Sequence, residues 1–137
     1  MKDILKWDDS LSTGVDEIDL QHKKLILVIN DVHAVLDAPE ASRAASMSKS
    51  LKSLTDYTHY HFSEEEALMR RNAYPQIEAH KTEHAAFVAE VTRQIRGLAQ
   101  PDPDAVIALY GFLGSWLLTH IAKSDRAWAD HLAKRKG

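Results

Sequence analysis

Residues 61–84 read HFSEEEALMRRNAYPQIEAHKTEH, and this stretch decides how the chain folds. His61 and Glu65 are four residues apart, and so are His80 and His84. Residues at that spacing lie one turn above each other on the same face of an α-helix. A proline stands between the two pairs and separates them. The stretch therefore predicts two antiparallel helix ends joined by a short turn, each directing two metal-binding side chains the same way.

Apolar residues recur at helical spacing on both sides of this stretch. Acidic residues and prolines indicate where helices start, and asparagine or glycine where they stop. The predicted helices span about 18–36, 39–71, 75–96 and 103–123. An extended N-terminal arm, residues 1–17, precedes them, and a short C-terminal helical tail, residues 124–137, follows. Because the connections are too short for crossovers, we expect a single all-α domain, an up-down-up-down four-helix bundle covering residues 1–137.

Composition narrows the class of protein. The 137 residues are 45% hydrophobic and 27% charged, as in a soluble globular domain. A formal net charge of −3 gives no basic surface for nucleic acid. There is no cysteine, which excludes disulfides, iron–sulfur clusters and thiolate zinc sites. Since no signal peptide is visible either, we expect a cytoplasmic protein.

One apolar run approaches the length of a membrane span. Residues 105–122, AVIALYGFLGSWLLTHIA, carry no formal charge. Glycines and polar residues dilute the run, and Asp102 and Asp104 stand just before it. We therefore expect a helix buried in a soluble bundle and no membrane insertion.

The topology of the bundle indicates whether other metal-binding residues lie near the His61–Glu65 and His80–His84 pairs. In an up-down bundle, the first helix starts, the second ends, the third starts and the fourth ends at the same end of the molecule. Seven candidate metal ligands fall at that end: His22, His61, Glu65, His80, His84, His120 and Asp125. The remaining histidines, His33, His59 and His131, lie too far along a helix or face away, so we expect surface or ordinary packing roles for them.

A single histidine on an apolar stripe is more often a hydrogen-bonded core residue than a ligand. Five histidines and two carboxylates in one place are different, because an unpaired buried charge is very costly. Seven ligands are too many for one tetrahedral zinc and suit two metal ions with bridging carboxylates. The donor types leave iron, zinc, copper and nickel open. No glutamate has a histidine three residues later, which excludes the ferritin-like di-iron class.

From Trp7 to Trp128 the chain resembles the hemerythrins, especially the single-domain bacteriohemerythrins. The motifs that carry this resemblance are IDLQH at 18–22, HFSEE at 61–65, HKTEH at 80–84 and HIAKSD at 120–125. The resemblance implies two non-haem iron ions with a bridging oxo or hydroxo group, which bind O2 reversibly. It also implies that three histidines, His80, His84 and His120, hold one iron, and that His22 and His61 hold the other. The carboxylates of Glu65 and Asp125 would bridge the two irons.

With that ligand set, only the iron held by His22 and His61 keeps an open position, where O2 would bind. The five-residue gap between His120 and Asp125 would place them about 140° apart on a straight helix, so we expect the helix to distort or end there. The expected wall of the O2 pocket consists of apolar residues next to the ligands or one turn away: Leu25, Phe62, Trp116, Leu117 and Ile121.

The sequence thus predicts an oxygen-binding protein that carries, stores or delivers O2 and is not an enzyme beyond a weak side activity. We expect a monomer whose recipient is an oxygen-consuming enzyme. Two alternatives stay open, a di-iron oxidase or peroxidase and a module that senses O2 or nitric oxide. HKTEH also matches the H-x-x-E-H pattern of a zinc peptidase, with Glu83 as general base, but this leaves the other ligands unexplained.

Overall fold

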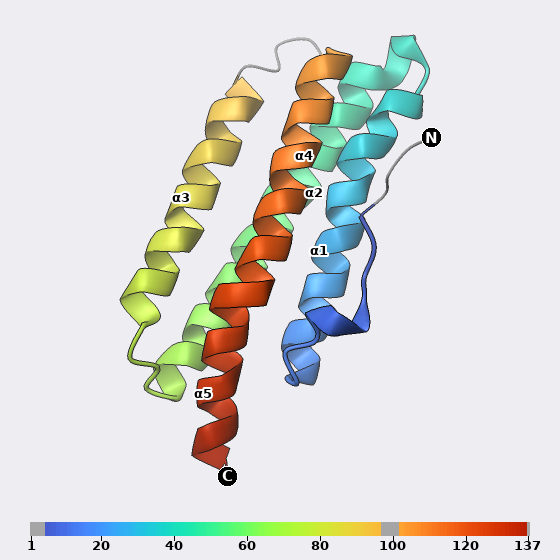
Figure 1. Cartoon of the computed structure of the whole chain (residues 1–137). Helices are drawn as coiled ribbons and strands as arrows, with labels where there is room; N and C mark the ends of the chain where they lie inside the picture. Colours follow the sequence, from blue (N-terminus) through green and yellow to red (C-terminus); the bar gives the residue numbers. More distant parts are fainter. Residues whose placement is uncertain (1–4, 97–101, 137) are drawn as a thin grey trace.

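The computed structural model describes residues 5–96 and 102–136. Four long helices dominate it: α1 (Asp16–Ala34), α2 (Glu40–Arg71), α3 (Ile77–Arg96) and α4 (Pro103–His120). Figure 1 shows them alternating in direction along the chain, and the described residues contain no strand. The predicted all-α, up-down-up-down four-helix bundle is confirmed. Parts of the predicted arm, of the connection after the third helix and of the tail (residues 1–4, 97–101 and 137) lie outside the described residues.

The helix ends differ from the sequence expectation by a few residues. The helix α1 begins at Asp16, because Asp16, Glu17 and Asp19 all complement the positive end of the helix dipole. It ends in a short 3-10 turn, η2 (Val35–Asp37). The helix α3 begins at Ile77 rather than at the proline, since residues 75 and 76 still belong to the turn that follows Ala73, which has a φ of 53°.

The described part of the N-terminal arm, residues 5–15, lies along α1 and is held by specific bonds (Figure 1). The hydroxyl of Tyr110, on α4, accepts a bond from the backbone N–H of Leu5 at 2.6 Å and donates to Asn30 at 3.0 Å. The Asn30 amide in turn donates to the carbonyl of Leu5 at 2.8 Å. The arm is not wholly extended as expected, because Asp9–Leu11 form a 3-10 turn, η1, closed by the Asp8 side chain.

The chain continues past α4 without a break. A π-helical turn, η3 (Ile121–Asp125), joins α4 directly to α5 (Arg126–Lys136). The predicted distortion between His120 and Asp125 is therefore present, and the predicted tail is a continuation of the fourth helix (Figure 1).

Two apolar clusters are stacked along the bundle axis. The larger cluster fills the middle of the four helices and includes Leu25, Phe62, Phe87 and Leu117. The smaller cluster closes the other side and is formed by Ile18, Met69, Tyr74, Trp128 and Leu132. Each of the four helices, with α5 taken as the continuation of α4, contributes residues to both clusters, and a short segment that carries polar side chains separates the two contributions. These segments hold the seven candidate ligands, so each apolar cluster covers one face of a buried polar layer.

Among the described residues, one helix, Pro103–Lys134, could cross a membrane by length and composition alone. This is weak evidence, since a core helix of a soluble protein passes the same test. Val106, Leu109, Leu113 and Leu117 on this helix are buried in the larger cluster, although only 33% of its apolar 18-residue window is buried.

Candidate metal centre

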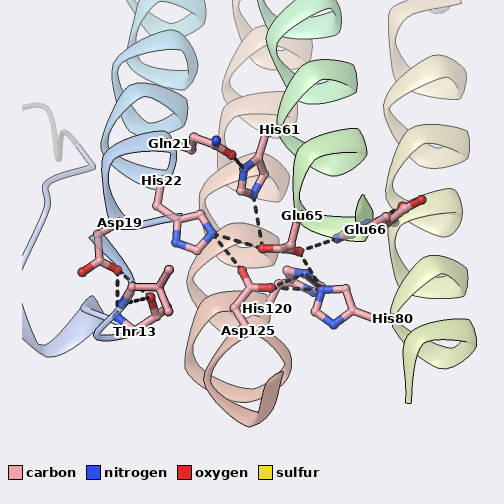
Figure 2. Close-up of polar contacts among 12 residues, drawn as sticks. Thr13, Asp19, Gln21, His22, His61, Glu65, Glu66, His80, His120 and Asp125 are labelled. Carbon is pink, nitrogen blue, oxygen red and sulfur yellow. Dashed lines mark hydrogen bonds and ion pairs between the residues drawn. The ribbon is translucent and has the colours of Figure 1, made fainter. Parts of the chain in front are cut away.

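All seven predicted ligand side chains lie together at one end of the bundle. Figure 2 labels all of them except His84. His22 comes from α1, His61 and Glu65 from α2, His80 and His84 from α3, His120 from α4 and Asp125 from η3. The exposed fraction of each side chain is 3% or less. The i, i+4 spacing on α2 and α3 turns each pair to the same side, and the antiparallel topology brings the pairs to the same level.

The donor atoms form two groups. The three-histidine group consists of Glu65, His80, His84 and His120. The two-histidine group consists of His22, His61, Glu65 and Asp125. Within each group the donor atoms lie within 4.8 Å of one another, as atoms that share one metal ion must.

The carboxylate of Asp125 faces both groups, one oxygen toward each. Its Oδ1 lies 3.0 Å from Nε2 of His80 and 3.2 Å from Nε2 of His120. Its Oδ2 lies 2.9 Å from Nε2 of His22. This is the geometry that a carboxylate bridging two metal ions requires.

Glu65 is arranged in the same way. Its Oε1 lies 2.8 Å from Nε2 of His80 and 3.1 Å from Nε2 of His84. Its Oε2 lies 3.7 Å from Nε2 of His61 and 4.0 Å from Nε2 of His22. The two carboxylates therefore connect the two histidine groups through four oxygens, two for each group.

The residues fit a pair of metal ions better than they fit one another. Several buried donor atoms have no aligned hydrogen-bond partner among the described residues, including Nε2 of His22, Nε2 of His84 and both oxygens of Asp125. Buried polar atoms without partners are costly. Atoms that lie this close without hydrogen-bond alignment are aimed at common points between them, where metal ions would satisfy them all.

The π turn explains how His120 and Asp125 serve one site. An α-helix would place residues five apart about 140° from each other, but a π turn repeats at i+5 and returns them to one face. The extra residue lets Asp125 face the three-histidine group while Trp128 still enters the smaller apolar cluster. Such turns recur at functional sites.

The charges of the metal-free cluster are unevenly distributed. Burial lowers the pKa of His61 to about 4, against the opposing effect of Glu65, so this imidazole is neutral at neutral pH. Burial also lowers the pKa of His80, but the adjacent Asp125 and Glu65 raise it to about 10. Burial would raise the pKa of Asp125, yet His120, His22 and His80 hold it well below its usual range. A metal ion must therefore displace a proton from His80.

Comparison with known proteins gives the same pattern. The family profile of the hemerythrin HHE cation binding domain matches residues 13–132. The chain belongs to the hemerythrin family. A bacteriohemerythrin of Pseudomonas aeruginosa is 36% identical over 126 residues, which cover 92% of this chain and 80% of that one. A bacteriohemerythrin of Methylococcus capsulatus is 30% identical over 135 residues, covering 95% and 98%.

A solved structure supports the hemerythrin fold. A crystal structure of a hemerythrin leucine-to-tyrosine mutant superposes with a TM-score of 0.77 at 28% identity and covers 94% of this chain and 97% of the other. The overall resemblance to hemerythrins in our sequence expectation is thus confirmed. The metal ions and the O2 chemistry are the subject of the proposal below.

Four of the five residues expected to wall the O2 pocket surround a small apolar cavity above the polar layer. The cavity measures about 10 Å³ and is lined by Leu25, Ile29, Leu54, Thr58, Phe62, Phe87, Trp116 and Leu117. Ile121 is fully buried in the larger cluster but does not line this cavity. The ring of Trp116 stacks on His120 at a centroid distance of 4.4 Å, so it also fixes a candidate ligand.

The other three histidines lie outside both donor groups of the described structure. His33 packs on Tyr110 at a ring distance of 4.6 Å, and His59 is exposed. His131 lies 3.1 Å from the carbonyl of Asn72 through its Nε2. These are the surface and packing positions that we expected.

Sequence reasoning overlooked the partners behind the hemerythrin ligands. Oε1 of Gln21 lies 2.7 Å from Nδ1 of His61, and Oε2 of Glu66 lies 2.8 Å from Nδ1 of His84. Gln21 is next to His22 in the sequence, and Glu66 is next to Glu65. This adjacency is the only feature of the sequence that connects the two partners with the site. Adjacent helical residues point about 100° apart, so the sequence does not reveal that they reach a ligand on the neighbouring helix.

Proposed function

We propose that this hemerythrin binds O2 reversibly at a centre of two non-haem iron ions. The observation that carries the proposal is that Glu65 and Asp125 each direct one oxygen to each histidine group. With both carboxylates and one bridging solvent-derived oxygen, an ion held by His80, His84 and His120 would have six donors, and an ion held by His22 and His61 would have five. An open position at the second ion, beside His22 and His61, follows from that count. Two ferrous ions held by the two histidine groups would supply the electrons for binding O2.

The protein's own residues would keep this site dry. The apolar cavity lies one helical turn from the ligands, because Leu25 follows His22 by three residues and Thr58 precedes His61 by three. Its volume of about 10 Å³ lies at the lower limit for holding one water-sized molecule. Apolar walls exclude water from the bound gas, which favours release over oxidation of a neighbour.

Hemerythrins are in general oxygen-binding proteins and not enzymes, and we propose the same for this chain. Carriage, storage or delivery to an oxygen-consuming enzyme, a cytoplasmic location, a monomeric state and the absence of membrane insertion belong to this proposal. The zinc-peptidase alternative gains no support, because the Glu83 carboxylate accepts a bond from Ser124 at 2.7 Å and lies at the outer nitrogen of His120. A general base would have to face the metal instead.

The test is anaerobic loading with ferrous iron, exposure to O2 and then removal of O2. We expect about two irons per chain and a visible absorption band that appears and disappears over repeated cycles. A colourless protein with one zinc ion would overturn the proposal. Sustained oxidation of an added reductant faster than autoxidation would show an oxidase or peroxidase instead, and a band that forms only with nitric oxide would indicate a sensor.

A further inference from the structure

Two ligand histidines are supported from behind by residues of different charge. His61, in the two-histidine group, is hydrogen-bonded through Nδ1 to the Gln21 amide. His84, in the three-histidine group, is hydrogen-bonded through Nδ1 to the Glu66 carboxylate. Each partner comes from the neighbouring helix, Gln21 from α1 and Glu66 from α2, and Figure 2 shows the contact of Gln21 with His61. Each group thus has one histidine with a bonded outer partner, and only the charge of that partner differs.

Two further outer nitrogens, those of His120 and His22, differ in their surroundings. Nδ1 of His120, also in the three-histidine group, lies 3.4 Å from Oε1 of Glu83, although the two atoms are not aligned for a hydrogen bond. Nδ1 of His22, in the two-histidine group, is buried without a hydrogen-bond partner among the described residues. The Asp19 carboxylate interacts electrostatically with His22 but is hydrogen-bonded to Ser12 and Thr13. The difference in charge is therefore carried by the two directly bonded partners, Gln21 behind His61 and Glu66 behind His84.

A carboxylate and an amide act differently on an imidazole. A carboxylate only accepts, so it keeps the proton on Nδ1 and leaves the lone pair of Nε2 for a metal. Its negative charge also makes the imidazole a stronger electron donor. A glutamine oxygen holds the same tautomer and orientation but adds no net charge. Stronger donation favours the more oxidised state of the metal that the histidine binds.

We propose that Gln21 is a positioning residue that orients His61 without adding charge, and that its contrast with Glu66 makes the two metal sites electronically unequal. The three-histidine site then favours the ferric ion, and the two-histidine site favours the ferrous ion. This inference rests on the proposed di-iron function. It places the more easily reduced iron at the open position, where O2 must be released again.

Reciprocal isosteric substitutions test the inference, because Gln and Glu have the same shape. Reduction potentials of the iron-loaded protein are measured by spectroelectrochemistry for the wild type, Gln21→Glu, Glu66→Gln and the double variant. We expect Gln21→Glu to lower the potential and Glu66→Gln to raise it, with the double variant exchanging which iron is oxidised first in Mössbauer spectra. Shifts in the same direction, or no shift in either variant, would overturn it.

The positioning role is tested without iron or O2. In zinc-loaded protein with ¹⁵N-labelled histidine, we expect the proton of His61 on Nδ1 in the wild type and in Gln21→Glu. We expect Gln21→Leu to lose the hydrogen bond that orders this proton. We also expect it to bind the metal of the two-histidine group about 10–100-fold more weakly. A wild-type His61 protonated on Nε2 would refute the role even if O2 binding is confirmed.

The two hypotheses fail in different ways. One outcome is a protein that binds two irons and shows the expected potential shifts, lower in Gln21→Glu and higher in Glu66→Gln, but no reversible O2 band. That outcome would support this inference and contradict the proposed function. A protein that binds O2 reversibly, but whose reduction potential neither substitution changes, would support the proposed function and contradict this inference. Glu64→Gln, at an exposed position on α2 next to Glu65, is the matched control for the negative charge that Glu66→Gln removes.

Discussion

Nε2 of His120 and Oδ1 of Asp125 lie 3.2 Å apart across the π turn that separates α4 from α5. Five residues separate them in the sequence, so an ordinary helix would turn them away from each other. The turn thus completes the centre: His120 belongs to the three-histidine group, and Asp125 connects that group to His22.

Asp125→Asn tests the bridging role. The amide keeps the size of the side chain but presents only one acceptor oxygen, so it cannot offer an anionic oxygen to both groups. We expect the protein to bind at most one metal ion per chain, measured by elemental analysis after loading and desalting. Asp130→Asn, an exposed substitution on α5, should keep two. Two tightly bound ions in Asp125→Asn would contradict the bridging geometry.

Trp128→Ala tests the smaller apolar cluster. Trp128 is fully buried against Ile18, Met69 and Tyr74, and its removal leaves a cavity. We expect a loss of about 3–5 kcal/mol in the free energy of unfolding, measured in urea. Metal retention should fall as well, because Trp128 anchors the helix turn after Asp125. Asp130→Ala should change the stability by less than about 0.5 kcal/mol. An equally small effect of Trp128→Ala would show that the cluster does not hold α5.

Thr58→Val tests the wall of the cavity. The Thr58 hydroxyl is buried and has no hydrogen-bond partner among the described residues, and its side chain lines the cavity. Valine has nearly the same shape and no polar atom, so we expect a gain of about 1 kcal/mol in unfolding free energy and slower autoxidation. Thr55→Val, at an exposed position one turn earlier, is the matched control. A loss of stability in Thr58→Val would mean that the hydroxyl binds a partner in solution.

The pH dependence of the metal-free protein follows from His80. Its pKa is raised from 6.5 to about 10 in the folded state, so its stabilising contribution is complete below pH 6.5 and is lost as the pH rises through 10. We expect the difference in melting temperature between the wild type and His80→Gln to narrow from pH 7 to pH 10. Groups that titrate equally in both proteins cancel in this comparison. A difference that widens with pH would show that His80 is neutral in the metal-free cluster.

Metal removal should weaken the bundle without unfolding it. The two apolar clusters contain no metal ligand, so we expect them to stay packed after the metal is removed. A ligand at 100 times its dissociation constant adds about 2.7 kcal/mol of stability, so chelation should lower the melting temperature by several degrees and preserve the helical circular dichroism. Loss of the helical spectrum on chelation would show that the metal is required for folding.

Much of the fold and most of the candidate site could be predicted from the sequence. His61 with Glu65 and His80 with His84 are visible as pairs because helical spacing is a local property. His22, His120 and Asp125 were added from topology, since short connections fix which helix ends meet. Distortion after His120 was expected from the same spacing argument.

The contacts between helices could not be predicted. The partners of His61 and His84, namely Gln21 and Glu66, depend on the rotation of each helix about its axis, and packing of the whole core sets that rotation. The cavity beside Thr58 depends on how side chains from four helices leave space between them.

The sequence alone determined an all-α bundle with seven candidate ligands at one end, because periodicity and short connections are encoded locally. Only the tertiary structure decided that a π turn, rather than a helix end, brings Asp125 into the centre. It also decided which oxygen of Asp125 and of Glu65 faces which histidine group, because those directions are set when the packed helices fix their relative rotation and height.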